Sequence, residues 1–178
     1  MSLKRFLYRG GQFWRHTRGT VVEQAAVRNV LTPKQMALFL RMQKGEQAHS
    51  LEVLRRLSRQ GETDPDLQVA ALLHDIGKIR FPLRLWERVW IVLARKALPG
   101  RFQKWGASQG ELSGLPWWQR ACAVAEQHPA WGAELAQSVG CSKRTVALIR
   151  RHQDKGPFDL QDGEDRLLAR LQAVDDQS

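Results

Sequence analysis

The chain has 178 residues, of which 43% are hydrophobic and 26% charged, and its formal net charge is +10. This composition excludes a disordered or fibrous chain, and the length fits one domain with an ordinary hydrophobic core. The positive charge attracts anions, whether small phosphorylated molecules, nucleic acid or an anionic membrane face.

The first 30 residues form a basic segment that glycine interrupts. Residues 1–20 hold five cationic side chains and no acidic one, namely Lys4, Arg5, Arg9, Arg15 and Arg18. A short helix is predicted near residues 21–30. We therefore predict two parts, a basic N-terminal segment at residues 1–30 and one domain at residues 31–178.

The rest of the chain consists of apolar residues at helical spacing, without the alternation that marks a strand. In chain order the predicted helices cover residues 33–42, 46–59, 65–74, 82–98, 116–127, 129–139, 143–152 and 163–175, with a linker rich in Gly and Ser at 106–114. Gly45 and Pro129 are expected to break helices. The predicted class is an all-α helical bundle.

The helix at 82–98 is amphipathic and rich in tryptophan. Its apolar side opposes Arg84, Arg88 and Arg95, and consists of Leu85, Trp86, Val89, Trp90 and Leu93. Such a stripe normally packs on its own core, so we expect it to face the domain core or the partner in a homodimer. Because Trp is enriched at membrane surfaces, contact with a bilayer is the alternative.

The cysteine content and the N-terminus predict a cytoplasmic protein. Cys122 and Cys141 are the two cysteines, and so few favour a reducing compartment in which both remain ordinary thiols. The first residues lack the apolar stretch and the cleavage site of a signal peptide. The apolar run of the 82–98 helix is also too short to span a membrane.

Histidine and carboxylate residues lie where a metal centre inside a helical bundle would need them. Imidazole and carboxylate groups suit divalent transition metals, and a hydrolytic site takes them from several helices. Four of the five histidines lie in or at the ends of predicted helices, and they are His49, His74, His128 and His152. His16 fits no such pattern and is expected at the surface.

The segment at residues 70–78, AALLHDIGK, holds three candidate functional residues close together. An apolar helix leads to His74 and Asp75, which are about 100° apart around its axis, and both can reach a metal beyond its end. The two oxygens of Asp75 can bridge two ions. Lys78 returns to the side of His74 and could hold a phosphate oxygen.

With a late aspartate, these residues resemble the H...HD...D signature of the HD superfamily of metal-dependent phosphohydrolases. The matching residues are His49, His74 and Asp75 within HDIGK, and Asp175. His128 in EQHPAWGAELA and His152 in ALIRRHQDKG resemble the two further histidines of the two-metal branch. The resemblance runs from about residue 31 to residue 176. It implies a helical HD domain with a metal centre in its core.

The resemblance also implies a mechanism with two divalent transition-metal ions, Fe or Mn in preference to Zn, Ni, Mg or Co. One ion would be held by His49, His74, Asp75 and Asp175, and the other by Asp75, His128 and His152. Asp75 would bridge the ions, a water between them would attack phosphorus, and Lys78 would clamp the phosphate. Asp176, after the same apolar helix, is the alternative to Asp175.

Departures from the family narrow the substrate. The branch that cleaves cyclic di-GMP has a double histidine followed by GYP, where this chain has RRHQDKGPF, which argues against that substrate. HD hydrolases of dinucleoside polyphosphates have Thr where this chain has Gln153, so that substrate stays open. We expect phosphoester hydrolysis, as a monoesterase or diesterase, on a nucleotide or related small molecule. The alternatives are a regulatory or binding module without turnover and a di-iron oxygenase.

Two further partner predictions concern the basic residues. Arg150 and Arg151, beside His152, are either a solvated face or contacts to substrate phosphate. The basic segment at residues 1–30 either steers small anionic substrates, which we favour, or makes a weak contact with nucleic acid or an anionic membrane surface.

Overall fold

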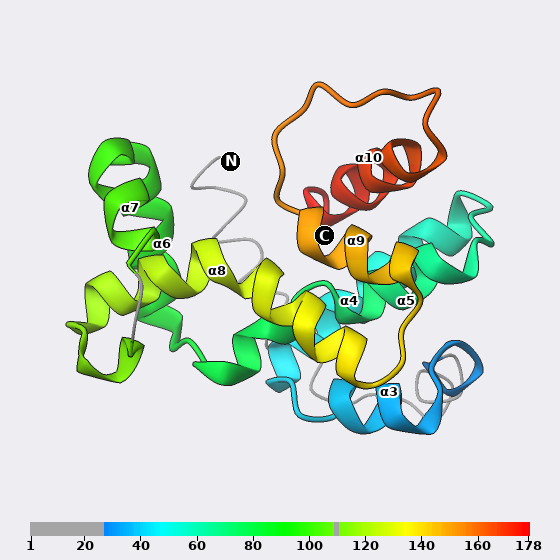
Figure 1. Ribbon diagram of the computed structural model, residues 1–178, viewed down its shortest axis with the longest axis horizontal. Coiled ribbons are helices and arrows are strands. Elements are labelled where there is room, and N and C mark those ends of the chain that lie inside the picture. Colours follow the sequence, from blue (N-terminus) through cyan, green and yellow to red (C-terminus); the bar gives the residue numbers. More distant parts are fainter. Residues whose placement is uncertain (1–26, 109–110) are drawn as a thin grey trace.

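A computed structural model describes residues 27–108 and 111–178, and within these ranges the protein consists of helices and connecting turns without a strand (Figure 1). The helices are α3 (Pro33–Phe39), α4 (Lys44–Arg59), α5 (Pro65–Leu73), the 3-10 helix η1 (Ile76–Arg80), α6 (Leu85–Ala97), α7 (Pro99–Gly106), the 3-10 helix η2 (Leu112–Gly114), α8 (Trp117–Ser138), α9 (Lys143–Arg151) and α10 (Gly163–Asp175). The all-α prediction is confirmed. Of the basic segment predicted at residues 1–30, residues 1–26, with His16, lie outside the described ranges, and residues 27–30 are helical.

Helix α5 lies within the larger of the hydrophobic clusters. Asp64 caps its first turn by accepting the N–H of Leu67 at 3.0 Å. After Gln68 its side chains are all apolar, and residues 70–73 are fully buried, as in a helix end that other helices enclose. Helices α4, α9 and α10 pack against it. The C-terminal end of α5 therefore carries His74 and Asp75 into the interior of the bundle.

A second, smaller part of the molecule is built on the N-terminal half of α8. Figure 1 shows α6 and α7 at one end of the molecule and α4, α5, α9 and α10 toward the other, with α8 running between them. Two small apolar clusters lie at the α6 and α7 end, and their buried residues are Leu83, Ala94, Phe102, Ala121, Cys122, Val124 and Ala125. Helix α8 is thus shared by both parts.

The continuity of α8 contradicts the predicted break at Pro129, because Trp117–Ser138 is one helix with Pro129 inside it. Proline lacks the N–H that would bond to the carbonyl four residues earlier, and this loss usually kinks or ends a helix. Here that carbonyl belongs to Ala125, and the Nδ1–H of His128 donates to it at 3.1 Å as well as to the carbonyl of Val124 at 3.0 Å. A side chain supplies the donor that Pro129 lacks.

Two smaller predictions also need correction. Gly45 does not break a helix but lies in the first turn of α4, where the backbone N–H groups have no intrahelical partner to lose. Pro99 ends α6 as expected, and it also opens α7, which was not predicted. The fixed φ of proline suits the first position of a helix.

The apolar side of the predicted 82–98 helix packs on the domain only in part, and the homodimer partner that we named as its other possible neighbour stays a prediction. The helix begins at Leu85, and of its residues Glu87 and Ala94 are the buried ones. Trp90 is half-buried and donates its indole N–H to the carbonyl of Trp118 at 2.9 Å. Ile91 also packs against the two small apolar clusters, whereas Leu85, Trp86 and Leu93 are exposed.

Candidate metal centre

Three buried histidines share one hydrogen-bonding arrangement. Each of His74, His128 and His152 has its Nδ1 beside the backbone carbonyl of the residue three positions earlier, at 3.0, 3.1 and 2.8 Å respectively. A carbonyl oxygen only accepts, so Nδ1 carries the proton and Nε2 keeps a free lone pair. Backbone contacts of this kind fix the tautomer and the ring orientation of metal-binding histidines.

The first group of candidate ligands is His49, His74 and Asp175, which come from α4, the end of α5 and the last turn of α10. The Nε2 of His49 lies 2.7 Å from Oδ1 of Asp175, and the Nε2 of His74 lies 3.6 Å from the same oxygen. The Nε2 of His74 is buried and has no hydrogen-bond partner among the described residues. A buried lone pair without a donor is expensive unless a cation occupies the space in front of it.

The second group is Asp75, His128 and His152, and all three are buried. The Nε2 atoms of His128 and His152 face each other at 3.2 Å. Since both rings carry their proton on Nδ1, these two nitrogens are both acceptors and cannot bond to each other while neutral. A shared cation resolves this contact, so the donor set fits a metal ion.

Asp75 connects the two groups. Its Oδ1 lies 3.2 Å from Nε2 of His128 and 3.8 Å from Nε2 of His152, whereas its Oδ2 lies 3.7 Å from Nε2 of His74. Each carboxylate oxygen therefore faces a different group. This is the arrangement that a carboxylate bridging two cations requires.

The protonation states favour metal binding. Burial lowers the pKa of His128, and burial together with the neighbouring His128 and His74 lowers the pKa of His152 to about 3. Burial alone would raise the pKa of Asp75, but Lys78 and the nearby imidazoles outweigh it and hold that pKa well below its usual range. Near neutral pH the second group therefore offers neutral imidazoles at His128 and His152 and an ionised carboxylate at Asp75, the forms that bind metals.

Lys78 lies at the edge of the site, and its partner Glu46 was not predicted. The Nζ of Lys78 lies 2.6 Å from Oδ2 of Asp75 and 3.9 Å from Oε1 of Glu46. Burial would lower the pKa of Lys78, but these two carboxylates raise it above its usual value, so Lys78 is charged. Glu46 is 3% exposed and pairs with Arg88 of α6 at 2.8 Å. In the sequence, Glu46 lies one helical turn before His49, and this spacing could have indicated that Glu46 faces the same site.

Gly77 allows η1 to lie directly against α8. A Cβ at this position would be 2.0 Å from the backbone oxygen of His128 and 2.8 Å from the backbone nitrogen of Gly132. We predicted Gly77 only as a helix breaker, but its backbone must also approach α8 closely. This approach brings Asp75 beside His128.

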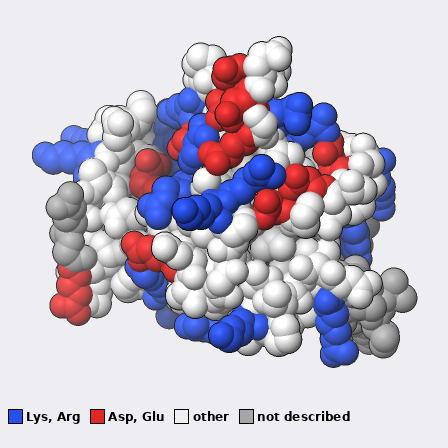
Figure 2. Space-filling model, turned by 45° about the vertical axis from the view of Figure 1, so that its right-hand side comes forward, with Lys and Arg blue, Asp and Glu red and all other residues white. Residues whose placement is uncertain are grey.

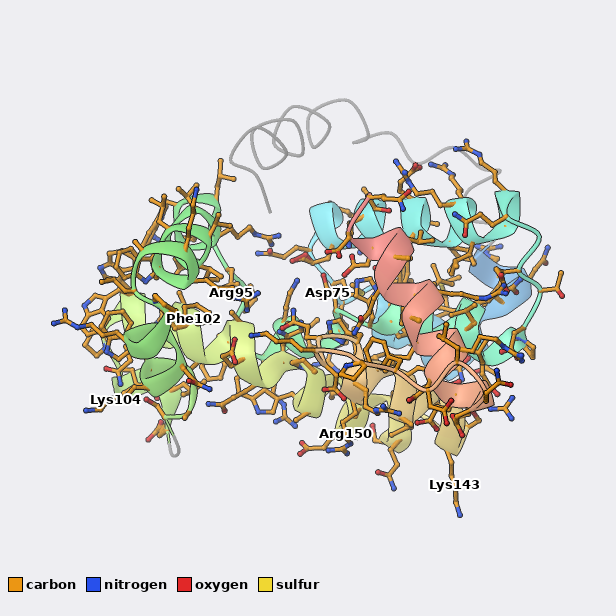
Figure 3. All side chains as sticks on the ribbon, turned by 90° about the horizontal axis from the view of Figure 1, so that it is seen from above. Asp75, Arg95, Phe102, Lys104, Lys143 and Arg150 are labelled. Carbon is orange, nitrogen blue, oxygen red and sulfur yellow. The ribbon has the colours of Figure 1, made fainter. Side chains whose placement is uncertain are left out.

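The remaining predicted site residues have other surroundings. Arg151 pairs with Asp154, Glu164 and Asp165 at 3.2, 2.8 and 2.7 Å, and so ties the end of α9 to the start of α10. Figure 3 shows Arg150 on the outer side of α9, directed away from Asp75. Phosphate contact by either arginine stays a prediction.

The acidic end of α10 and the two cysteines also have clear positions. Asp175 joins the first group of ligands, whereas Asp176 is exposed, so Asp175 is the better candidate ligand. Cys122 is buried and Cys141 half-buried, and both are free thiols. Neither belongs to the two groups of candidate ligands.

The fold and the site define an all-helical protein with two adjoining groups of candidate metal ligands in its interior. The model of the HD domain family matches residues 47–176, most of the chain, and the chain belongs to this family. The family commonly includes metal-dependent phosphohydrolases, and its domains bind divalent metals. Comparisons with curated proteins and with solved structures found no match. In the described ranges, every helix is too short or too polar to cross a membrane.

Proposed function

We propose that this protein is a metal-dependent phosphohydrolase that cleaves a phosphoester of a nucleotide or a related small phosphorylated molecule. The observation that carries the proposal is the pair of ligand groups that Asp75 connects. The Nε2 of His74 in the first group has no hydrogen-bond partner among the described residues, and in the second group the Nε2 atoms of His128 and His152 face each other without a proton between them, so a cation would satisfy all three. An all-helical regulatory module would not need six such side chains to converge.

The residues of the two groups would hold one divalent ion each. His49, His74 and Asp175 would hold the first, Asp75 with His128 and His152 the second, and Asp75 would contribute to both. Bound ions of this kind act as Lewis acids. They lower the pKa of a bound water toward neutral pH and stabilise charge on phosphoryl oxygens. The mixed nitrogen and oxygen ligands suit Fe or Mn, and also Zn, Ni or Co.

The remaining residues of the site would orient the ligands and the substrate. The backbone carbonyls behind His74, His128 and His152 hold the three rings with Nε2 directed inward. The Lys78 ammonium is charged and next to the carboxylate of Asp75, so it would attract a phosphate oxygen. Glu46 would help to keep Lys78 in this position, since its Oε1 lies 3.9 Å from the ammonium.

A reconstitution experiment tests the proposal. Protein treated with a chelator would be reloaded with Mn, Fe(II), Zn or Ni, and phosphate release and diester cleavage would be measured on a panel of nucleotides. We expect close to two ions per chain and turnover on at least one substrate. Absence of metal uptake contradicts the metal centre. Metal uptake with O₂ consumption but no hydrolysis favours the di-iron oxygenase, and metal uptake with neither activity favours the binding module.

Two substitutions separate metal binding from phosphate binding. Asp75→Ala should abolish turnover and lower metal content while the helical circular dichroism spectrum is retained, because Asp75 contributes to both groups. Lys78→Ala should keep the metal content and slow turnover by on the order of 10² to 10³, the usual effect of removing one electrostatic donor in an active site. Wild-type turnover by a folded, metal-free Asp75→Ala protein would refute the mechanism.

A further inference from the structure

Helix α6 presents an apolar stripe to the outside of the molecule. Leu85, Leu93 and Trp86 are 67%, 47% and 44% exposed, and Val89 and Val92 between them are half-buried. At 100° per residue these five side chains occupy an arc of about 120° on one side of the helix. The stripe is therefore continuous along α6.

Neighbouring elements extend the stripe. Trp117 of α8 is exposed and packs edge-on against Trp86, with ring centroids 4.4 Å apart. Leu98, which joins α6 to α7, is also exposed. Five of the seven large exposed hydrophobic side chains among the described residues lie here, a concentration that marks an interaction surface. The α6 surface is defined as Leu85, Trp86, Val89, Val92, Leu93, Leu98 and Trp117.

Exposed cations accompany the α6 surface without neutralising carboxylates. Arg84, Lys96, Arg101 and Lys104 are exposed, and none of them forms an ion pair with another described residue. Figure 3 shows Lys104 on the outer side of α7. In contrast, acidic and basic side chains are interspersed on the face that Figure 2 shows.

The acidic residues nearby offset only part of this charge, because Glu111, shortly before Trp117, is the one exposed carboxylate there that makes no ion pair with a described residue. Glu87 of α6 is buried and pairs with Arg120 at 3.2 Å, and Glu126 of α8 pairs with Arg95 at 3.0 Å. Both carboxylates are thus already matched by arginines outside the set of four exposed cations. The α6 surface and its margin carry a surplus of positive charge.

We propose that the α6 surface docks onto an anionic membrane surface. Apolar side chains on one side of a helix, with tryptophan and basic residues beside them, are the features of a helix that lies in the membrane interface. Leucine and valine would enter the boundary of the acyl chains, Trp86 and Trp117 would lie at the level of the headgroups, and the four cations would contact lipid phosphates. The helix would lie on the bilayer without crossing it.

The charges argue against other occupants. A two-fold contact with a second copy would bring the exposed cations of the two chains together, and like charges so placed cost affinity. Residues 1–20 of the same chain are also an unfavourable occupant of the α6 surface. They hold five cations and no acidic residue, so they would be repelled by the exposed cations there. Nucleic acid would attract the cations but would offer no apolar volume for Leu85 and Leu93.

Co-sedimentation of the full chain with vesicles tests this inference. The vesicles would contain phosphatidylcholine alone or phosphatidylcholine with phosphatidylserine, at low and at physiological salt. We expect binding to the anionic vesicles only, weakened by salt because the cations contribute to it. The double substitution Leu85→Asp with Leu93→Asp should lower the affinity by about tenfold or more, since it removes apolar contact and adds negative charge.

A matched control uses two leucines elsewhere. Leu40 and Leu160 are 58% and 59% exposed and lie outside the α6 surface, so Leu40→Asp with Leu160→Asp should bind vesicles like the wild type. Because all four leucines are exposed, both double variants should fold, and circular dichroism checks this. Lys96→Gln with Lys104→Gln should reduce the difference between anionic and neutral vesicles.

Several results would overturn the inference. They are no binding to anionic vesicles at low salt, equal binding to neutral vesicles, or unchanged binding by the Leu85 and Leu93 variant. A dimer by light scattering that this variant loses would instead assign the α6 surface to a second copy. Loss of vesicle binding only when residues 1–20 are removed would assign it to that segment, and binding to duplex or single-stranded nucleic acid without vesicle binding would assign it to nucleic acid.

Discussion

The Nδ1–H of His128 is shared between the carbonyl of Val124 and that of Ala125, the acceptor that Pro129 leaves without its usual backbone donor. One residue thus both satisfies the acceptor that Pro129 leaves open within α8 and turns Nε2 toward the second ligand group. The His128-Pro129 pair in α8 therefore fixes the direction of the His128 imidazole.

Replacing Pro129 with alanine tests this relationship. Alanine would supply an N–H to Ala125 and compete with His128 for that carbonyl, so the ring would keep only the carbonyl of Val124 and would be less well fixed. We expect the metal-free protein to gain stability, since proline inside a helix is unfavourable, and metal affinity to fall by about tenfold. Thermal unfolding and competition with a chelator measure the two effects. Pro116→Ala, at the start of α8, should leave metal affinity unchanged.

Gly77→Ala should destabilise the protein. The added methyl group would overlap the backbone of α8 at His128, and η1 and α8 would have to separate. We expect a loss of about 1 to 3 kcal/mol in the free energy of unfolding, together with weaker metal binding, because Asp75 would move away from His128. Denaturant unfolding measures this loss. Gly100→Ala is the control, because nothing lies within 4 Å of its Cβ position, and it should be neutral or slightly stabilising.

Arg88 and Arg95 allow two ion pairs of one helix to be compared. Arg88 pairs with buried Glu46, whereas Arg95 pairs with the exposed carboxylate of Glu126. Arg88→Gln should therefore cost about 1 to 3 kcal/mol in unfolding free energy, because it leaves a buried carboxylate with one fewer partner. Arg95→Gln should cost about 0 to 1 kcal/mol. Equal losses in denaturant unfolding would contradict this difference.

The metal-free protein should lose stability in acid. His128 and His152 have a lower pKa in the folded chain than in the unfolded chain, so the unfolded chain binds more protons. Their contribution is present above about pH 6.5 and decreases as pH falls from there toward about 3, the pKa of folded His152. Asp75, with its lowered pKa, adds to the loss below about pH 4.

Thermal unfolding from pH 8 to pH 4 measures this loss. Each of the two histidines should lower the free energy of unfolding by up to ~1.4 kcal/mol per pH unit in that window. His152→Gln should flatten the profile. A metal-free wild type whose stability is constant between pH 7 and pH 4 would contradict the expected burial of neutral imidazoles.

The sequence allowed the ligand positions to be predicted because each lies at a recognisable local place. His74 and Asp75 follow an apolar helix, His152 ends an amphipathic one, and Asp175 ends the last one. His49 and His128 were predicted as well, and the structure brings all six residues into two adjoining groups. Local sequence patterns could not predict contacts between residues that are distant in the chain. Neither the pairing of Arg88 with Glu46 nor the donor that satisfies Ala125 can be deduced from spacing.

The amphipathic pattern of α6 likewise predicted a helix but not its surroundings. Periodicity identifies an apolar side and is silent on whether other elements cover it. The structure leaves Leu85 and Leu93 exposed, while Arg88 and Arg95 make ion pairs to other helices. An apolar stripe therefore does not by itself identify the core.

The two ligand groups differ in how much of the chain must be in place before they can form. Asp75, His128 and His152 are all present once the chain has folded through α9. His49 and Asp175 are 126 positions apart, and their group is complete only after α10 packs against α4. The two halves of the centre would thus mature in sequence during synthesis, the inner one before the outer one. A chain whose last helix is still undocked would be able to capture one ion and not two.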